Sequence, residues 1–273
     1  MKKWHISNLY LIFVFLVLYL PIIYLIFYSF NAGDTMDHFS GFSWRHYGTL
    51  LSDSRMISIV LNTLIIALLS SLIATIVGTL GALGIYSTKK AAVKNGLLSL
   101  NNVLMVSPDV IIGASFLIFF TFLGFSLGFG SVLLSHIAFS IPIVVLMVLP
   151  KINELPATMV DAAYDLGATT WQTLTKVILP AITPGIFAGF FMAFTYSLDD
   201  FAVTFFVTGN GFSTLSVEIY SRARQGVDLE VNALSTLMFI VSLLLVVGYY
   251  LLGRYNQSRR MQRVKAAEAK INQ

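Results

Sequence analysis

The chain contains no cysteine, so disulfide bonds, thiolate metal sites and cysteine nucleophiles are excluded. Charged residues are also scarce, at 11% of the 273 residues, whereas 57% of the residues are hydrophobic and the mean hydropathy is +0.82. This composition is far too apolar for a soluble domain. We therefore expect an all-α integral membrane protein whose apolar stretches cross the membrane as helices.

A phosphate-binding loop of the form GxxxxGK[ST] is also missing from the sequence. Any ATP hydrolysis must therefore come from another chain, and we expect no enzymatic activity, cofactor or metal site in this one. No internal repeat or low-complexity linker stands out. We interpret residues 1–273 as a single transmembrane domain.

Six apolar stretches are long enough to span a hydrocarbon core, which takes about 20 helical residues. They lie at residues 9–30, 57–86, 103–125, 132–149, 181–207 and 233–252. The first follows the basic start MKKWH, but it is too long for a signal peptide and has no small-residue cleavage site. We expect it to stay in place as the first membrane helix.

Most lysines and arginines fall on one side of this topology, in the N-terminus, two connecting loops and the basic tail at 253–273. The exceptions are Arg45, Arg55, Arg222 and Arg224. By the positive-inside rule, both termini and the loop at 151–180 are cytoplasmic. The tail is then an orientation signal that also meets anionic membrane lipid, and we expect no nucleic-acid partner.

The cytoplasmic loop contains the segment DAAYDLGATTWQTLTKVILP at residues 161–180. Gly167 is placed as the C-cap of a first short helix. Thr169 and Gln172 match a capping box at the start of a second short helix, which Pro180 should end. Two short helices with small alanines on the first predict a compact element that docks closely into another protein.

Three carboxylates interrupt the apolar stretches: Asp109 in the third, and Asp199 and Asp200 in the fifth. Ionised groups in the membrane cost several kcal/mol unless they face a partner charge or a watery path, and a negative path favours cations. At about 1.5 Å per helical residue, Asp109 should lie roughly 10 Å and Asp199 roughly 25 Å from the cytoplasmic side. Adjacent helical residues point about 100° apart, so Asp199 and Asp200 should not both face the path.

Structural roles compete with this interpretation. One of the paired aspartates could form an internal ion pair with Arg222 or Arg224, and Asp109 could cap backbone freed by Pro108. Two aromatic residues could likewise have either a functional or a structural role. Trp44 and Tyr196 could hold an ammonium group by a cation–π contact, or they could belong to the core or the interfacial belt.

Small residues recur every four positions in two of the expected helices. They are Ala74, Gly78 and Ala82 in the second, and Gly185, Gly189 and Ala193 in the fifth. Such ridges let helices approach closely in lipid. We favour packing inside the subunit over a dimer seam.

The loop segment resembles the EAA loop of ABC-importer permeases. The matching positions are Asp161, Ala162, Ala163, Gly167, Val177, Leu179 and Pro180. The Asp and the Val replace Glu and Ile of the family pattern. SPDVIIG at 107–113, YSLDDFAVTFFVTG at 196–209 and the segment at 217–236 are similar to permeases of the spermidine/putrescine branch.

The resemblance implies a MetI-like (type I) permease fold with a cytoplasmic EAA coupling loop, in a bacterial cell membrane. It also implies a second homologous permease subunit, two copies of a cytoplasmic ATPase that binds ATP and Mg, and an extracytoplasmic polyamine-binding protein. The polyamine path of the family falls on Trp44, Asp109, Ser197, Asp199 and Asp200. We expect alternating access, driven through the coupling loop.

Other functions fit parts of the sequence. The importer could carry another cationic or small solute. The stretch at 124–128, GFSLG, matches the G-x-S-x-G nucleophile pattern and is followed by His136, as an intramembrane serine protease would require. The match falls in a turn between membrane helices rather than in a strand-turn-helix unit, which argues against a protease. A passive channel would need no docking loop.

Overall fold

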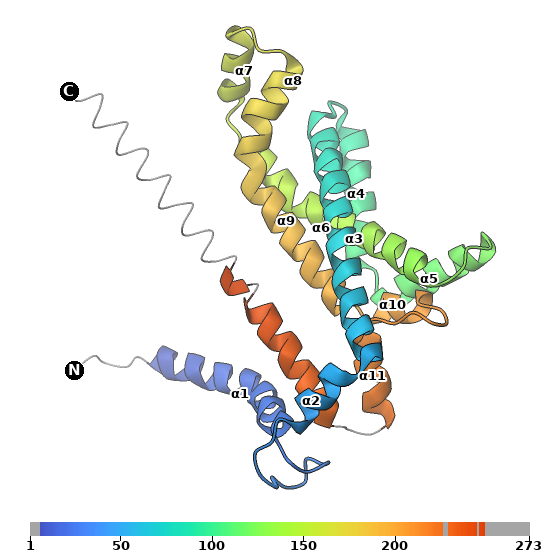
Figure 1. The fold of residues 1–273 in the computed structure, drawn as a ribbon. Coiled ribbons are helices and arrows are strands. Elements are labelled where there is room, and N and C mark those ends of the chain that lie inside the picture. Colours follow the sequence, from blue (N-terminus) through green and yellow to red (C-terminus); the bar gives the residue numbers. More distant parts are fainter. Residues whose placement is uncertain (1–5, 226–228, 245, 249–273) are drawn as a thin grey trace. The chain divides into compact units, whose positions relative to one another are not determined.

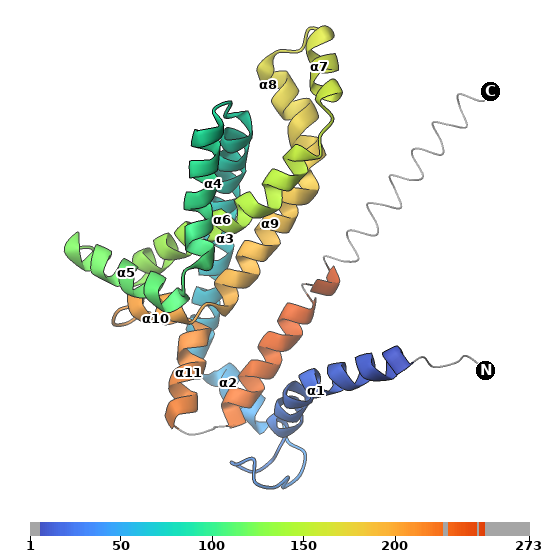
Figure 2. The same cartoon turned by 180° about the vertical axis from the view of Figure 1, so that it is seen from behind.

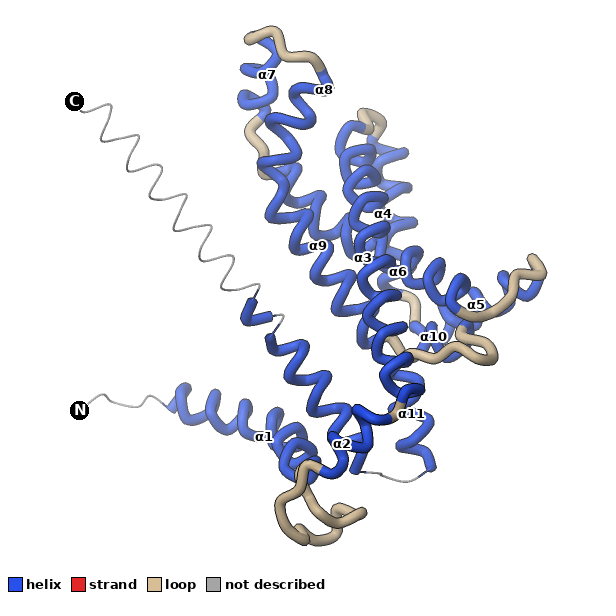
Figure 3. The backbone as a smooth tube through the Cα atoms, in the orientation of Figure 1, coloured by secondary structure: helices blue, strands red, loops and turns tan. Residues whose placement is uncertain are grey.

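The computed structural model describes residues 6–225, 229–244 and 246–248 (Figure 1). These residues form helices joined by loops, with an isolated β-bridge between Asn31 and Phe42 (Figure 3). The all-α prediction is therefore confirmed for this part of the chain. The helices are α1 (Ile6–Ser29), α2 (Arg45–Ser52), α3 (Ser54–Ser87), α4 (Ala91–Val106), α5 (Asp109–Phe122), α6 (Phe129–Asn153), α7 (Ala157–Asp165), α8 (Thr170–Thr173), the π-helical turn η1 (Leu174–Ile178), α9 (Leu179–Asp199), α10 (Ala202–Val207), α11 (Leu215–Gln225) and the helix Leu229–Gly248.

The chain divides into two compact units. Unit 1 comprises Met1–Ser54 and Arg222–Gln273, and unit 2 comprises Arg55–Ser221. In unit 1, the loop after α1 is fixed by Asn31, whose side-chain amide donates to the carbonyl oxygens of Thr35 and His38. The prediction of one domain over the whole chain stays a prediction. The basic tail lies outside the described residues.

Five helices are long and apolar enough to cross a membrane, and the pair α4 and α5 makes a sixth span if the two are counted together. They follow the order of the six predicted stretches. The pair is bent by 103°, so the prediction of one span over 103–125 is wrong. Ser107 at the bend has an extended backbone with ψ 137°, as expected because the ring of Pro108 disfavours the helical conformation in the residue before it.

The fifth span also differs from its prediction at both ends. A continuous apolar helix runs over Thr170–Asp199, so Pro180 does not end a second short helix as predicted. The π-helical turn Leu174–Ile178 widens the helix directly before Pro180, where a proline removes one backbone donor and crowds the preceding turn. At the other end the helix stops at Asp199 rather than at residue 207, because Asp200 is extended with ψ 118°.

The core of unit 2 forms where α3 and α9 pack against α6. A Cβ added to Gly78 would lie 2.7 Å from Val144 Cβ, and one added to Gly189 would lie 3.2 Å from Val144 Cγ1. Both small-residue ridges therefore let their helices approach α6 within the same chain, which confirms the prediction of packing inside the subunit. Figures 1 and 2 show α7 and α8 at one end of this unit, whereas α10 lies toward the other end.

Gly113 lies where α5 packs closely against α10. A Cβ at this position would lie 3.0 Å from Val203 Cα and 3.1 Å from the carbonyl oxygen of Ala202, both backbone atoms that cannot rotate away. We expect Gly113→Ala to destabilise the protein by about 1–3 kcal/mol through overpacking. The loss of stability is measured as the shift in the thermal unfolding of the protein in detergent. Gly96→Ala in α4 is the matched control, because no atom lies within 4 Å of its added Cβ, and an equal loss in both variants would contradict the packing role of Gly113.

Candidate functional site

A cavity of about 380 Å³ opens where the first residue of α5, the last turn of α9 and the start of α10 meet. Its lining combines carboxylates with apolar and aromatic side chains: Asp109, Met192, Thr195, Tyr196, Asp199, Asp200, Phe201 and Ala202. The two helix breaks, at Pro108 and at Asp200, bring these residues together. Asp109 and Asp199 therefore share one cavity, and the prediction that they lie at different depths is wrong because it assumed straight helices.

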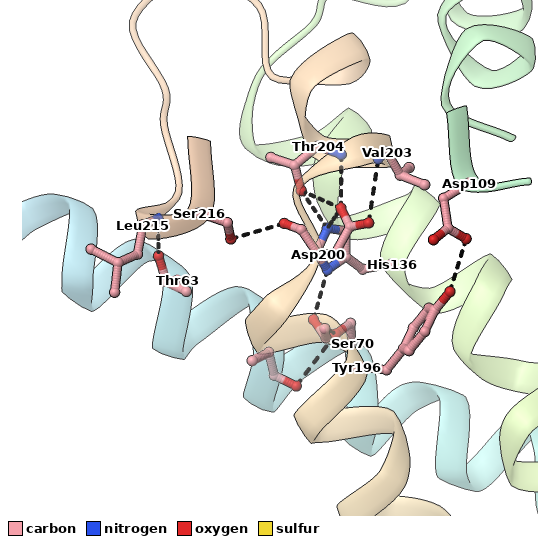
Figure 4. Close-up of polar contacts among 12 residues, drawn as sticks. Thr63, Ser70, Asp109, His136, Tyr196, Asp200, Val203, Thr204, Leu215 and Ser216 are labelled. Atoms are coloured by element: carbon pink, nitrogen blue, oxygen red, sulfur yellow. Dashed lines mark hydrogen bonds and ion pairs between the residues drawn. The ribbon is translucent and has the colours of Figure 1, made fainter. Parts of the chain in front are cut away.

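Asp109 begins α5 and is exposed. The phenol oxygen of Tyr196 donates a hydrogen bond to Asp109 Oδ1 over 2.9 Å (Figure 4). The ring of Tyr196 meets that of Phe139 edge to face, with centroids 5.2 Å apart. Phe139 thus fixes the tyrosine, and the tyrosine orients the carboxylate while leaving its other oxygen available to a ligand.

Asp200 has a different environment, because its side chain is only 4% exposed. Its carboxylate accepts hydrogen bonds from Thr204 N at 2.8 Å, Thr204 Oγ1 at 2.7 Å and Val203 N at 3.3 Å. His136 Nε2 lies 3.4 Å from Asp200 Oδ2. The basic partner of Asp200 is thus a histidine of α6, and not one of the arginines considered from the sequence.

Asp199 is exposed, and its side chain makes no hydrogen bond or ion pair with any described residue. The two adjacent aspartates therefore face different surroundings, as predicted from the angle between neighbouring helical residues. Of the two, Asp199 is the carboxylate that is free to bind a cation.

His136 is the residue that the sequence analysis missed. Its ring is buried, with Nδ1 2.6 Å from Ser197 Oγ and Nε2 2.8 Å from Thr204 Oγ1. Ser197 Oγ also lies 3.0 Å from Ser70 Oγ, so the network links α3, α6, α9 and α10. A histidine inside an apolar span is a recognised signal of function, but we considered it only as a partner of Ser126. Its ring nitrogens bond Ser197 and Thr204, so the protease hypothesis is wrong.

Two other predicted path residues are not among the residues that line the cavity. Ser197 is buried behind it, in the hydrogen-bond network of His136. Trp44 belongs to unit 1, where it is 62% exposed and packs on the rings of Phe30, Phe42 and Tyr47. Its role in the path stays a prediction.

The coupling segment has the predicted helix-glycine-helix form. Gly167 has φ +78°, its N–H donates to the carbonyl of Tyr164, and the N–H of Ala168 donates to the carbonyl of Ala163. These two bonds form a Schellman motif at the end of α7. Thr169 and Gln172 form the predicted capping box.

The tip of this segment is apolar and open to solvent. Leu166 is 89% and Trp171 70% exposed, and both flank the glycine turn. Asp161 and Ala162 are also exposed, Ala163 is half-buried, and Leu179 and Pro180 lie further on in the first turn of α9. A protruding apolar tip on a well-capped turn is suited to docking into a groove of a second protein.

Comparison with known proteins identifies the family. Residues 78–262 match the family of binding-protein-dependent transport system inner membrane components. The spermidine/putrescine transport system permease protein PotC of Haemophilus influenzae is 38% identical, over 94% of this chain and 99% of the relative. PotC of Escherichia coli K12 is 37% identical over 88% and 91%, and the putrescine transport system permease protein PotI of that strain is 35% identical over 94% of both chains.

Solved structures agree on the fold. A bacterial ABC transporter involved in alginate import superimposes with a TM-score of 0.71 at 20% identity, over 89% of this chain and 91% of the other. The MetNI methionine ABC transporter gives a TM-score of 0.61 at 19% identity, over 72% and 95%. The chain therefore belongs to the binding-protein-dependent family of inner membrane components, the non-catalytic permease subunits of ABC transporters with a MetI-like fold.

Proposed function

We propose that this chain is a permease subunit of an ABC importer for polyamines of the spermidine and putrescine type. The observation that carries the proposal is the cavity in which the exposed carboxylates of Asp109 and Asp199 lie together beside Tyr196. The names of the relatives, PotC and PotI, point to the same substrates.

A polyamine is a flexible apolar chain with spaced ammonium groups, and the cavity offers a partner for each part. Carboxylates attract the ammonium groups, while Met192, Tyr196 and Phe201 can cover the methylenes and contribute cation–π contacts. A solute with a single positive charge would use only one of the two exposed carboxylates. The geometry therefore favours polyamines over other small cations.

The importer that we propose contains further subunits. A second homologous permease completes the membrane part, an extracytoplasmic protein delivers the polyamine, and two copies of a cytoplasmic ATPase bind ATP and Mg. The exposed tip at Leu166 and Trp171, with Asp161, Ala162, Ala163 and Gly167, is the surface that we assign to the ATPase.

One helix supports the mechanism of alternating access. Thr170–Asp199 is continuous over 30 residues, which corresponds to a length of about 45 Å. Its first turn carries the capping box of the coupling segment, and its last turn carries Tyr196, Ser197 and Asp199. A movement of the docked tip on ATP binding therefore reaches the substrate cavity through a single continuous element.

A complementation experiment tests the function. The gene for this chain is expressed with its neighbouring transporter genes in a bacterium that lacks polyamine importers, and uptake of labelled spermidine and putrescine is measured. We expect uptake to be restored, and to be lost when the gene for this chain alone is removed. Restoration without this gene would contradict the proposal.

The proposed orientation predicts which positions an impermeant thiol reagent can label from outside intact cells. Because the chain has no cysteine, single cysteines can be introduced one at a time. Cysteines near Asp37 should react, whereas cysteines near Lys94 and Thr169 should react only after the membrane is opened. Gly226, a further external position in this topology, lies outside the described residues. The reverse pattern would place the coupling segment outside and contradict the docking assignment.

A further inference from the structure

We propose that His136 is a specificity-determining residue: it neutralises Asp200, so that the cavity presents two uncompensated carboxylates and favours substrates with two ammonium groups in the site. The inference rests on the proposed function and concerns the choice between putrescine, a diamine, and spermidine, a triamine. His136 does not line the cavity, so it acts through Asp200 rather than by touching the substrate.

The carboxylate of Asp200 is ionised, and its oxygens already accept hydrogen bonds from neighbouring donors. Two backbone N–H groups and the Thr204 hydroxyl all donate to its carboxylate. Three donated hydrogen bonds are a set that an ionised carboxylate accepts. Because these donors and His136 surround its side chain, Asp200 has little capacity left for an ammonium group, in contrast to Asp109 and Asp199.

The contacts of Thr204 place a hydrogen on Nε2 of His136. The Thr204 hydroxyl donates its only hydrogen to Asp200 Oδ2. At 2.8 Å from His136 Nε2, Thr204 Oγ1 must therefore act as the acceptor, and Nε2 carries a hydrogen. This nitrogen points toward the carboxylate side of the network, since Asp200 Oδ2 is 3.4 Å away.

The other ring nitrogen of His136, Nδ1, also has a hydrogen-bond partner. Nδ1 lies 2.6 Å from Ser197 Oγ, which lies 3.0 Å from Ser70 Oγ, and Ser70 can donate to the carbonyl oxygen of Ala67 over 3.3 Å. A hydrogen on Nδ1 thus starts an unbroken series of donors and acceptors that ends on a backbone carbonyl. Each ring nitrogen of His136 therefore has a hydrogen-bond partner.

An ionised carboxylate buried without a partner charge is costly, and His136, with its side chain 1% exposed, is the basic group beside Asp200. The other titratable side chains at the cavity are Asp109, Tyr196 and Asp199. With His136 and Asp200 paired, the exposed carboxylates Asp109 and Asp199 determine the charge that a substrate meets.

The test is the ratio of spermidine to putrescine transport in the reconstituted importer, measured as maximal rates with saturating loaded binding protein so that receptor affinity cancels. In His136→Gln the amide can hydrogen-bond but carries no charge, so the negative charge of Asp200 in the cavity wall is no longer balanced. We expect the ratio to rise by about 5-fold, which corresponds to roughly 1 kcal/mol. The double variant His136→Gln/Asp200→Asn should return to the parent ratio, because it removes both charges.

Asp200→Asn alone provides an independent arm if His136→Gln does not assemble. The proposal predicts slower transport of both substrates at the parent ratio, because the two exposed carboxylates Asp109 and Asp199 are unchanged. Ser135→Ala is the matched control on α6, since its buried hydroxyl has no hydrogen-bond partner among the described residues, and it should keep the parent ratio.

Two results would overturn the proposal: an unchanged ratio in assembled His136→Gln, or a shift toward putrescine in Asp200→Asn, which would make Asp200 a direct ammonium ligand. A merely structural histidine would lower both rates alike. Failure of the proposed function looks different, because the parent importer itself would then transport neither polyamine.

Discussion

Asp199→Asn is expected to reduce polyamine uptake by roughly 10-fold to 100-fold, because the loss of one charged contact is worth about 1.4 to 3 kcal/mol. Asp199 is exposed in the cavity, and its side chain carries no hydrogen bond or ion pair among the described residues. Its charge therefore supports no other side chain, and its removal should leave folding intact. The measurement is uptake of labelled spermidine, with assembly of all subunits checked on the same preparation.

Asp109→Asn should act in the same direction, while Asp199→Glu, which keeps the charge, should retain much of the activity. Asp37→Asn is the matched control, since Asp37 is an exposed carboxylate in the loop after α1 and is not one of the residues assigned to the path. If Asp199→Asn assembles and transports polyamine like the parent, the carboxylate has no part in binding.

Gly167→Val is expected to abolish coupled transport, either by preventing assembly with the ATPase or by separating ATP hydrolysis from uptake. The physical reason is the backbone, because Gly167 has φ +78° and nothing lies within 4 Å of its added Cβ. A β-branched residue is strained in this left-handed conformation. The Schellman bonds at Gly167 and Ala168 would be weakened, and the tip with Leu166 and Trp171 would be displaced.

The measurement is ATP hydrolysed for each polyamine transported in the reconstituted importer. Gly96→Val is the matched control, because it makes the same change at a helical glycine that also has no atom within 4 Å of the added Cβ. Normal assembly and coupling in Gly167→Val would place the ATPase contact elsewhere.

Local signals allowed much of the fold to be predicted from sequence. Apolar stretches mark the spans because lipid surrounds them, whatever their neighbours are. The C-cap at Gly167 and the capping box at Thr169 were also predictable, since each depends on residues within one helical turn.

The breaks in the helices were harder to predict because hydropathy runs across them. The effect of Pro108 on Ser107 was visible in the sequence, but the apolar run continues on both sides. Asp200 ends α9 because its carboxylate satisfies the N–H groups of Val203 and Thr204 at the start of α10. Depth counted along straight helices therefore failed, although Asp109, Tyr196 and Asp199 do line one cavity.

His136 shows most clearly what could not be predicted from the sequence alone. Its direct partners come from α9 and α10, and Ser70 of α3 joins the network through Ser197, so no local spacing in the sequence reveals the network. Only the fold brings Ser197 and Thr204 to the same ring.

The most direct test of the account is uptake by proteoliposomes that contain the complete importer, with ATP supplied to the ATPase side. Labelled putrescine, spermidine and choline, a cation with a single charge, are compared in the parent and in the double variant Asp109→Asn/Asp199→Asn. The account predicts ATP-dependent uptake of both polyamines but little of choline by the parent, and loss of polyamine uptake in an assembled double variant. Equal uptake of choline, or a double variant that transports polyamines like the parent, would contradict it.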